Sequence, residues 1–147
     1  MLQITNSTRS IFSTTLTIGD PAGSNETIQF QSINIWPSDT INPNIGLEFN
    51  AFGGSYRATS QKISIDGDAF GIELAGVPKA ACIQVLSTIA GATRDSGLVY
   101  ANATILPVGD AVINLAGSLA LPVTVAQAAI SCNGAATAVL TFVFSLH

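Results

Sequence analysis

The fold is decided by residues 73–91, which read ELAGVPKAACIQVLSTIAG. A strand-like segment from Phe70 to Ala75 leads into this stretch, and Gly76 and Pro78 are expected to close that segment. Pro78 suits the first turn of a helix, because its missing N–H has no intrahelical partner there. The sequence therefore predicts a strand followed directly by a helix.

The apolar residues after Pro78 recur at helical spacing. At about 100° per residue they fall within one arc of roughly 160°. The arc contains Cys82, Ile83, Val85, Leu86, Ile89 and Ala90, whereas Gln84, Ser87 and Thr88 lie opposite. Gly91 is placed to end the helix. Cys82 is thus predicted to lie on the buried face of a short amphipathic helix.

The chain has two cysteines, Cys82 and Cys132, and two interpretations of them stay open. A disulfide would close a loop of about 50 residues and contribute about 4 kcal/mol in the chain-entropy model. Two inert buried thiols are the alternative. The low charge and the Ser, Thr and Asn content, typical of secreted proteins, favour the disulfide. Such a bond would connect the helix to the start of a strongly β-like segment, Thr137 to Phe144.

Composition narrows the class of protein. The 147 residues predict one domain, 1–147. Only 10% of the residues are charged, and the formal net charge is −4, against a charged fraction of about a quarter in an average soluble domain. The absence of a basic cluster argues against nucleic-acid binding. The longest apolar region, Ala111 to Cys132, is broken by Asn114, Gly117, Pro122 and Gln127, so it predicts strands and a short helix and not a membrane span. No signal peptide pattern follows Met1.

Other elements are predicted from apolar periodicity and turn residues. Helices are expected over Leu2 to Leu16, with Ile4, Thr8, Ile11 and Thr15 at helical spacing, over Glu26 to Ile35, and over Pro122 to Ile130. Strands are expected at 47–51, 55–59, 62–65, 70–75, 99–106, 111–116 and 136–144. A hairpin turn is expected at Asp66-Gly67-Asp68, and Trp36 is expected to anchor the core. Because the last strand is apolar on both faces, it should lie centrally in a sheet.

Residues that would carry catalysis or bind a metal are scarce. The only histidine is the last residue, His147, which argues against histidine-based catalysis and against a Cys/His zinc site. Asp66 and Asp68 offer two carboxylates to a cation, but turn chemistry explains them fully. The cysteines are not in a Cys-x-x-Cys arrangement, so a structural bond is favoured over a reactive one. We therefore expect that the protein is not an enzyme and that it has no catalytic residue, no cofactor and no metal.

A series of motifs, in this order, resembles the type IVb pilins. They are Ile35-Trp36-Pro37-Ser38-Asp39, then Phe49-Asn50-Ala51-Phe52-Gly53-Gly54, then Gly76-Val77-Pro78-Lys79-Ala80-Ala81-Cys82, and finally Cys132-Asn133 before the strand from Thr137 to Phe144. A Ser/Thr-rich helix near Ile11-Phe12-Ser13 precedes them. The branch that matches best includes the thin pili of conjugative plasmids and enterobacterial adhesive pili. Ser96 to Leu121 matches no pattern of that family.

The resemblance implies an α+β fold, in which an N-terminal helix packs on an antiparallel β-sheet. It also implies a Cys82–Cys132 disulfide that bounds a C-terminal region, 82–132, and makes residues 1–16 the rear half of a longer helix whose apolar front half is missing.

By the same likeness, the full-length protein would be held in the inner membrane before assembly. It would then polymerise with copies of itself into an extracellular pilus for adhesion or conjugation. Its other partners would be the pilus assembly machinery and a host-cell receptor or recipient cell surface. Two alternatives stay open: a minor pilin or pseudopilin that primes or caps a filament, and a secreted carbohydrate-binding adhesin.

Overall fold

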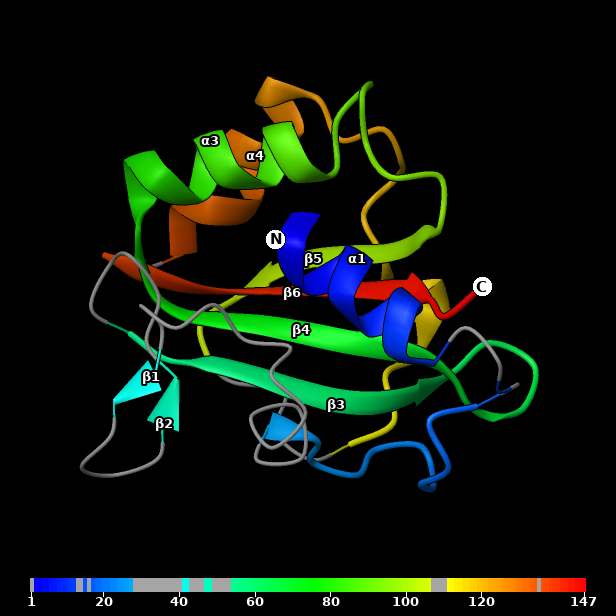
Figure 1. Ribbon diagram of the computed structural model, residues 1–147. Helices are drawn as coiled ribbons and strands as arrows, with labels where there is room; N and C mark the ends of the chain where they lie inside the picture. Colours follow the sequence, from blue (N-terminus) through cyan, green and yellow to red (C-terminus); the bar gives the residue numbers. More distant parts are fainter. Residues whose placement is uncertain are drawn as a thin grey trace.

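The computed structural model describes residues 2–12, 15, 17–27, 41–42, 47–48, 54–106, 111–134 and 136–147. Its centre is a four-stranded antiparallel sheet in the order β3-β4-β6-β5 (Figure 1). The strands are β3 (Tyr56–Lys62), β4 (Asp66–Pro78), β5 (Leu98–Thr104) and β6 (Thr137–Ser145), and a separate pair is formed by β1 (Ile41–Asn42) and β2 (Leu47–Glu48). The helices are α1 (Leu2–Ile11), α3 (Lys79–Ile89) and α4 (Val125–Ser131), with 3₁₀ turns η2 (Leu115–Gly117) and η3 (Cys132–Gly134). The predicted α+β class is confirmed.

Strand β6 lies between β4 and β5, as its apolar sequence predicts. Phe142 and Phe144 belong to the core beneath the helices, whereas Val143 packs in a second cluster with Tyr100 and Ile113. Phe70 of β4 pairs with Phe144, and their rings stack with centroids 5.5 Å apart. Because both of its faces are buried, β6 has no solvent-facing side that would call for alternating polar residues.

Helices α1, α3 and α4 contribute to one hydrophobic core. In α3, Cys82, Leu86 and Ala90 are fully buried one turn apart, which confirms the predicted apolar arc. Ile4 of α1 and Phe12, just after the helix, are buried, and the buried Thr8 hydroxyl is satisfied by donating to the Ile4 carbonyl at 2.7 Å. Helix α1 ends at Ile11, which is 44% exposed, and not at Leu16 as predicted.

The outer edge of β3 is covered by residues 23–27, which run alongside it (Figure 1). The Gly23 N–H donates to the Ser60 carbonyl at 2.7 Å, and the Glu26 N–H donates to the Ala58 carbonyl at 2.8 Å. The Ala58 N–H in turn donates to the Thr27 hydroxyl at 3.0 Å. This segment satisfies backbone groups that an edge strand leaves unpaired.

The outer edge of β5 is covered in a different way. The Leu119 N–H donates to the Ala101 carbonyl at 2.9 Å, and the Ala101 N–H donates to the Ser118 hydroxyl at 3.1 Å. Further along, the Ala103 N–H donates to the side-chain oxygen of the neighbouring Asn102 at 2.9 Å. The coverage of this edge therefore depends on side chains more than on another strand.

The hairpin between β3 and β4 turns earlier than predicted. The turn is at residues 63–65, and Asp66 already belongs to β4. The Asp68 carboxylate accepts hydrogen bonds from the backbone N–H groups of Ile63, Ser64 and Ile65, at 2.7, 2.9 and 3.2 Å. Gly67, with φ +83°, passes close to the 17–20 loop, and its carbonyl accepts from the Ile18 N–H.

Three other boundaries differ from the prediction. Gly76, with φ +70°, does not end β4, because an irregularity between Leu74 and Val77 absorbs it and pairing with β6 continues to Pro78. Residues 111–116 are not a strand: the Gln61 side chain binds the Ala111 carbonyl and the Ile113 N–H, and η2 follows. Helix α4 begins after Thr124, which forms a capping box with Gln127, and not at Pro122.

Several predictions fall outside the described residues. They are residues 28–35 of the predicted helix that ends at Ile35, the predicted core position of Trp36, residues 49–51 of the strand predicted at 47–51, and residues 49–53 of the motif that ends at Gly54.

Candidate assembly surface and disulfide-bounded region

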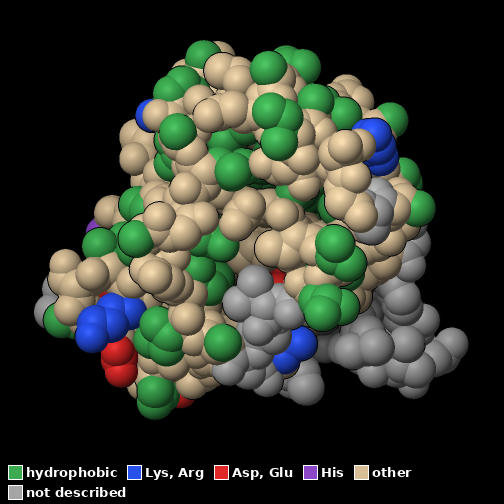
Figure 2. Space-filling model, turned by 180° about the vertical axis from the view of Figure 1, so that it is seen from behind, with side chains coloured by type: hydrophobic (Ala, Val, Ile, Leu, Met, Phe, Trp, Pro, Cys, Tyr) green, Lys and Arg blue, Asp and Glu red, His purple; other side chains and the backbone are tan. Residues whose placement is uncertain are grey.

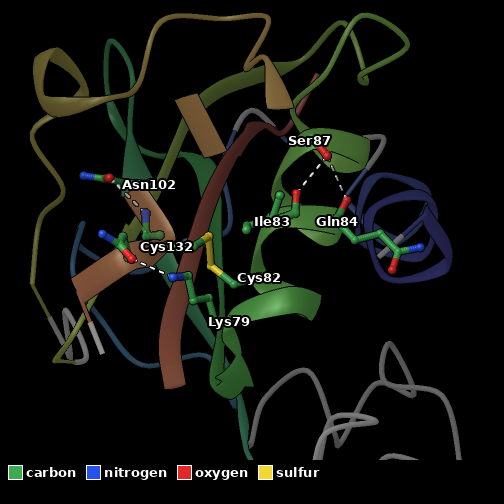
Figure 3. Close-up of a disulfide and its surroundings, with 9 residues drawn as sticks. Lys79, Cys82, Ile83, Gln84, Ser87, Asn102 and Cys132 are labelled. Atoms are coloured by element: carbon green, nitrogen blue, oxygen red, sulfur yellow. Dashed lines mark hydrogen bonds between the residues drawn. A yellow bond between two sulfur atoms is a disulfide. The ribbon is translucent and has the colours of Figure 1, made fainter. Parts of the chain in front are cut away.

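Cys82 of α3 and Cys132 at the end of α4 form a disulfide (Figure 3). Their Cα atoms are 6.0 Å apart, 50 residues separate them, and the exposed fractions of the two residues are 0% and 1%. The resemblance to pilins implies this pair. A bond that closes so long a loop restricts the unfolded chain strongly.

Two further contacts hold the same region closed. The Lys79 ammonium donates to the side-chain oxygen of Asn133 at 2.6 Å, one residue beyond the disulfide (Figure 3). The Val123 N–H donates to the Ala90 carbonyl at 2.8 Å, at the opposite end of α3. Helices α3 and α4 are therefore linked near both ends of α3.

Helix α1 is attached to the loop before β5 by an ion pair that sequence reasoning missed. Arg9 and Asp95 lie 2.8 Å apart, with side chains 26% and 24% exposed. The Arg9 guanidinium also donates twice to the Ser145 carbonyl at 3.1 Å. The hydrogen bond from Arg9 lowers the pKa of Asp95 below its ordinary value, and a hydrogen bond from the Gly97 N–H acts in the same direction. Partial burial acts to raise this pKa but is outweighed. Positions 86 residues apart leave no local pattern that would identify such a pair.

Glu26, also missed, is fully buried in the segment that covers β3. Burial, followed by a hydrogen bond and repulsion from the Asp20 carboxyl, raises the pKa of Glu26 to about 8. The Glu26 side chain is therefore protonated at neutral pH. The nearby Asp20 carboxyl therefore favours the neutral form of Glu26.

The residues considered for catalysis or metal binding take structural roles. Asp68 holds the hairpin turn: partial burial acts to raise its pKa, but hydrogen bonds from the three turn N–H groups and from its own N–H together lower it. Within the described ranges, no group of three or more His, Cys, Asp and Glu side chains is arranged to hold a metal ion. The exposed His147 ring contacts the Thr15 carbonyl, so the C-terminus is held near the end of α1.

The surface around the disulfide-bounded region is almost without charge. Residues 111–147 include no Asp, Glu, Lys or Arg. Four large apolar side chains stand out from this part of the molecule, with exposed fractions of 61% for Ile105, 75% for Leu106, 66% for Val125 and 78% for Ile130. Figure 2, which shows the molecule from behind, has hydrophobic groups scattered over a largely uncharged face. Few ions would lose water if such a face met another protein.

Among the helices built from described residues, none has the length and hydropathy needed to cross a membrane.

Comparison with solved structures finds two pilins. The type IV b pilin from Salmonella typhi superposes with a TM-score of 0.62 at 16% identity, over 95% of this chain and 92% of that one. TcpA, a type IV pilin from Vibrio cholerae El Tor biotype, gives a TM-score of 0.58 at 16% identity, over 97% of this chain and 95% of that one. At such identities the likeness establishes the fold alone.

Comparison with curated protein sequences gives no significant match. The family model described as PilS N terminal, in contrast, matches residues 1–145, nearly the whole chain. Together with the helix on an antiparallel sheet and the Cys82–Cys132 bond, this match shows that the chain belongs to the PilS family of type IVb pilins.

Proposed function

We propose that this pilin is the repeating structural subunit of an extracellular type IV pilus, and that the pilus serves adhesion or conjugation. The observation that carries the proposal is the uncharged surface of residues 111–147 together with the exposed Ile105, Leu106 and Ile130. Ile105 and Ile130 line one groove, and apolar side chains that gather on a surface, unlike scattered ones, can mark an interaction site. A neighbouring copy supplies the partner for this site, and the disulfide keeps the surface folded outside the cell.

The test is to express the full-length gene with its own assembly machinery in a strain that has no other pilin. Sheared surface material is then examined by electron microscopy and mass spectrometry. Filaments in which this chain is the dominant protein are the expected result. A trace amount of this chain in filaments built from another pilin would instead identify a minor, priming subunit. Failure to enter any filament, with saturable glycan binding by the monomer, would identify an adhesin and overturn the proposal.

Adhesion and conjugation are separated by two assays on one pair of strains. A strain lacking the gene is compared with its parent for attachment to host cells and for plasmid transfer to recipient cells. Loss of one activity alone assigns the role of the pilus. Loss of neither would contradict both roles.

A further inference from the structure

Two apolar features of different shape lie on this chain. The first, which we call the apolar rim, consists of Ile105, Leu106 and Ile130. Ile105 and Ile130 flank a groove of about 250 Å³ that Thr137 and Ala138, at the start of β6, help to line. All three rim side chains are more than half exposed. The rim is therefore an exposed hydrocarbon surface at one end of the sheet.

The second feature is a pocket of about 290 Å³ between α1, α3 and the loop that follows α3. Thr5, Thr88, Ile89, Arg94 and Phe144 are among the residues that line it. Arg94 and Asp95 are the charged residues of this lining, and the Asp95 charge is compensated by Arg9 at 2.8 Å. This volume is at the lower end of those that hold small-molecule ligands. It therefore matches a few aliphatic side chains better than a large ligand.

The rim and the pocket lie at opposite ends of the same strand. The rim adjoins Ala138, near the first residue of β6, and the pocket adjoins Phe144, near the last. Six residues of extended chain between them span about 20 Å. Figure 1 shows β6 running across the whole sheet between these two ends. A copy whose pocket contacts the rim of its neighbour therefore still has its own rim exposed at the other end of the strand.

We propose that the apolar rim of one subunit inserts into the pocket of the next copy of this chain. The inference depends on the proposed function, because it names the contact through which the filament grows. Since the two patches differ, the contact is heterologous, and repetition of it gives an open filament unless the rotation closes a ring. Neither rim nor groove contains a charged side chain, so the insertion removes no ion of the rim from water.

A charge placed in the rim tests the contact. Ile130→Asp is compared with Val125→Asp, a matched control on the same helix α4, with 66% exposure against 78% and no part in the groove. In full-length protein with its assembly machinery, Ile130→Asp is expected to lower the yield of sheared filaments about tenfold or more, as the loss of a central apolar contact does. Val125→Asp is expected to leave the yield unchanged. Both variants are first checked for the wild-type melting temperature.

Rescue tests whether rim and pocket meet each other. Thr88→Lys places an ammonium at the pocket, and the double variant Ile130→Asp/Thr88→Lys is expected to recover filaments that Ile130→Asp alone loses. Independently, Ile130→Cys and Thr88→Cys chains expressed together are expected to form a reducible dimer within filaments, whereas either chain alone forms none. The dimer assay stays informative even if the charged variants fold poorly.

The possible outcomes separate the two proposals. Wild-type filaments with an equal yield for Ile130→Asp and Val125→Asp, and with no mixed dimer, overturn the rim-and-pocket contact and leave the pilus function standing. Absence of wild-type filaments overturns the proposed function itself. Loss of filaments in Ile130→Asp with no rescue and no mixed dimer shows that the rim meets some other surface, and also overturns the contact.

Discussion

The guanidinium of Arg9 lies 2.8 Å from the carboxylate of Asp95, and this pair fixes the N-terminal helix to the loop before β5. The Ser145 carbonyl accepts two more hydrogen bonds from the same guanidinium. One side chain thus connects α1, the α3–β5 loop and the end of β6. We expect the docking of α1 to depend on it.

Arg9→Ala should lower the free energy of unfolding by about 2 kcal/mol, because the partners are partly buried and the hydrogen bonds are charge-assisted. Urea unfolding of Arg9→Ala, Asp95→Ala and the double variant gives the coupling between the two residues. Since the pKa of Asp95 is lowered in the fold, its contribution is present above its ordinary pKa of 3.8 and is lost as the pH falls through the folded value. Lys62→Ala, at an exposed position, is the control. Additive effects of the two substitutions would contradict the coupling.

The disulfide should account for a large share of the stability. Replacing both cysteines by serine is expected to lower the free energy of unfolding by about 4 kcal/mol, because the loop between them is long. Denaturant unfolding with and without a reductant measures the effect. The reductant should shift the midpoint of the wild type but not that of the Cys82→Ser/Cys132→Ser variant. Equal midpoints for the two proteins without reductant would show that the bond contributes nothing.

Glu26 should make stability depend on pH between about 4.5, its ordinary pKa, and about 8. The folded protein holds the Glu26 proton more tightly than the unfolded chain, so folding becomes less favourable as the pH rises through this window and levels off above it. The total loss is at most about 5 kcal/mol. Glu26→Gln keeps the neutral form at every pH and should flatten the curve. Unfolding midpoints from pH 5 to 9 check this, and parallel curves for the two proteins would disprove it.

The β3–β4 turn should depend on the Asp68 carboxylate. Asp68→Ala removes the acceptor for the N–H groups of Ile63, Ser64 and Ile65, and we expect a loss of about 1 to 2 kcal/mol at neutral pH. Hydrogen exchange should speed up at these three amides. Asp66→Ala, at the neighbouring exposed position, is the matched control. The difference between the two variants should shrink at acid pH, where the Asp68 carboxylate becomes protonated. Unchanged exchange rates at the turn would mean that the carboxylate does not hold it.

Patterns that depend on periodicity predicted the structure well. Cys82, Leu86 and Ala90 recur once per turn, and each is buried against the sheet. The last strand is apolar on both faces, and β6 is central. Such patterns are local in the chain, and the burial of one face requires apolar residues at several positions of the pattern at once.

Predictions failed where a side chain, near or distant in sequence, decides the backbone conformation. Ala111 to Ala116 looks like a strand, but Gln61 takes the hydrogen bonds that a neighbouring strand would have made. The turn moved to residues 63–65 because Asp68 folds back on it. Arg9–Asp95 and the buried Glu26 could not be predicted, since their environments are assembled only by the tertiary fold.

Both long edges of the sheet carry their own cover, residues 23–27 along β3 and the Ser118, Leu119 and Asn102 groups along β5. Where these described residues cover the edges, a strand donated by a neighbour, which is how some other fimbrial subunits are joined, would find backbone groups that are already bonded. If the filament grows by side-chain contacts alone, a subunit that dissociates from it keeps all of its own backbone hydrogen bonds. Depolymerised pilin would then be fit for reuse without refolding.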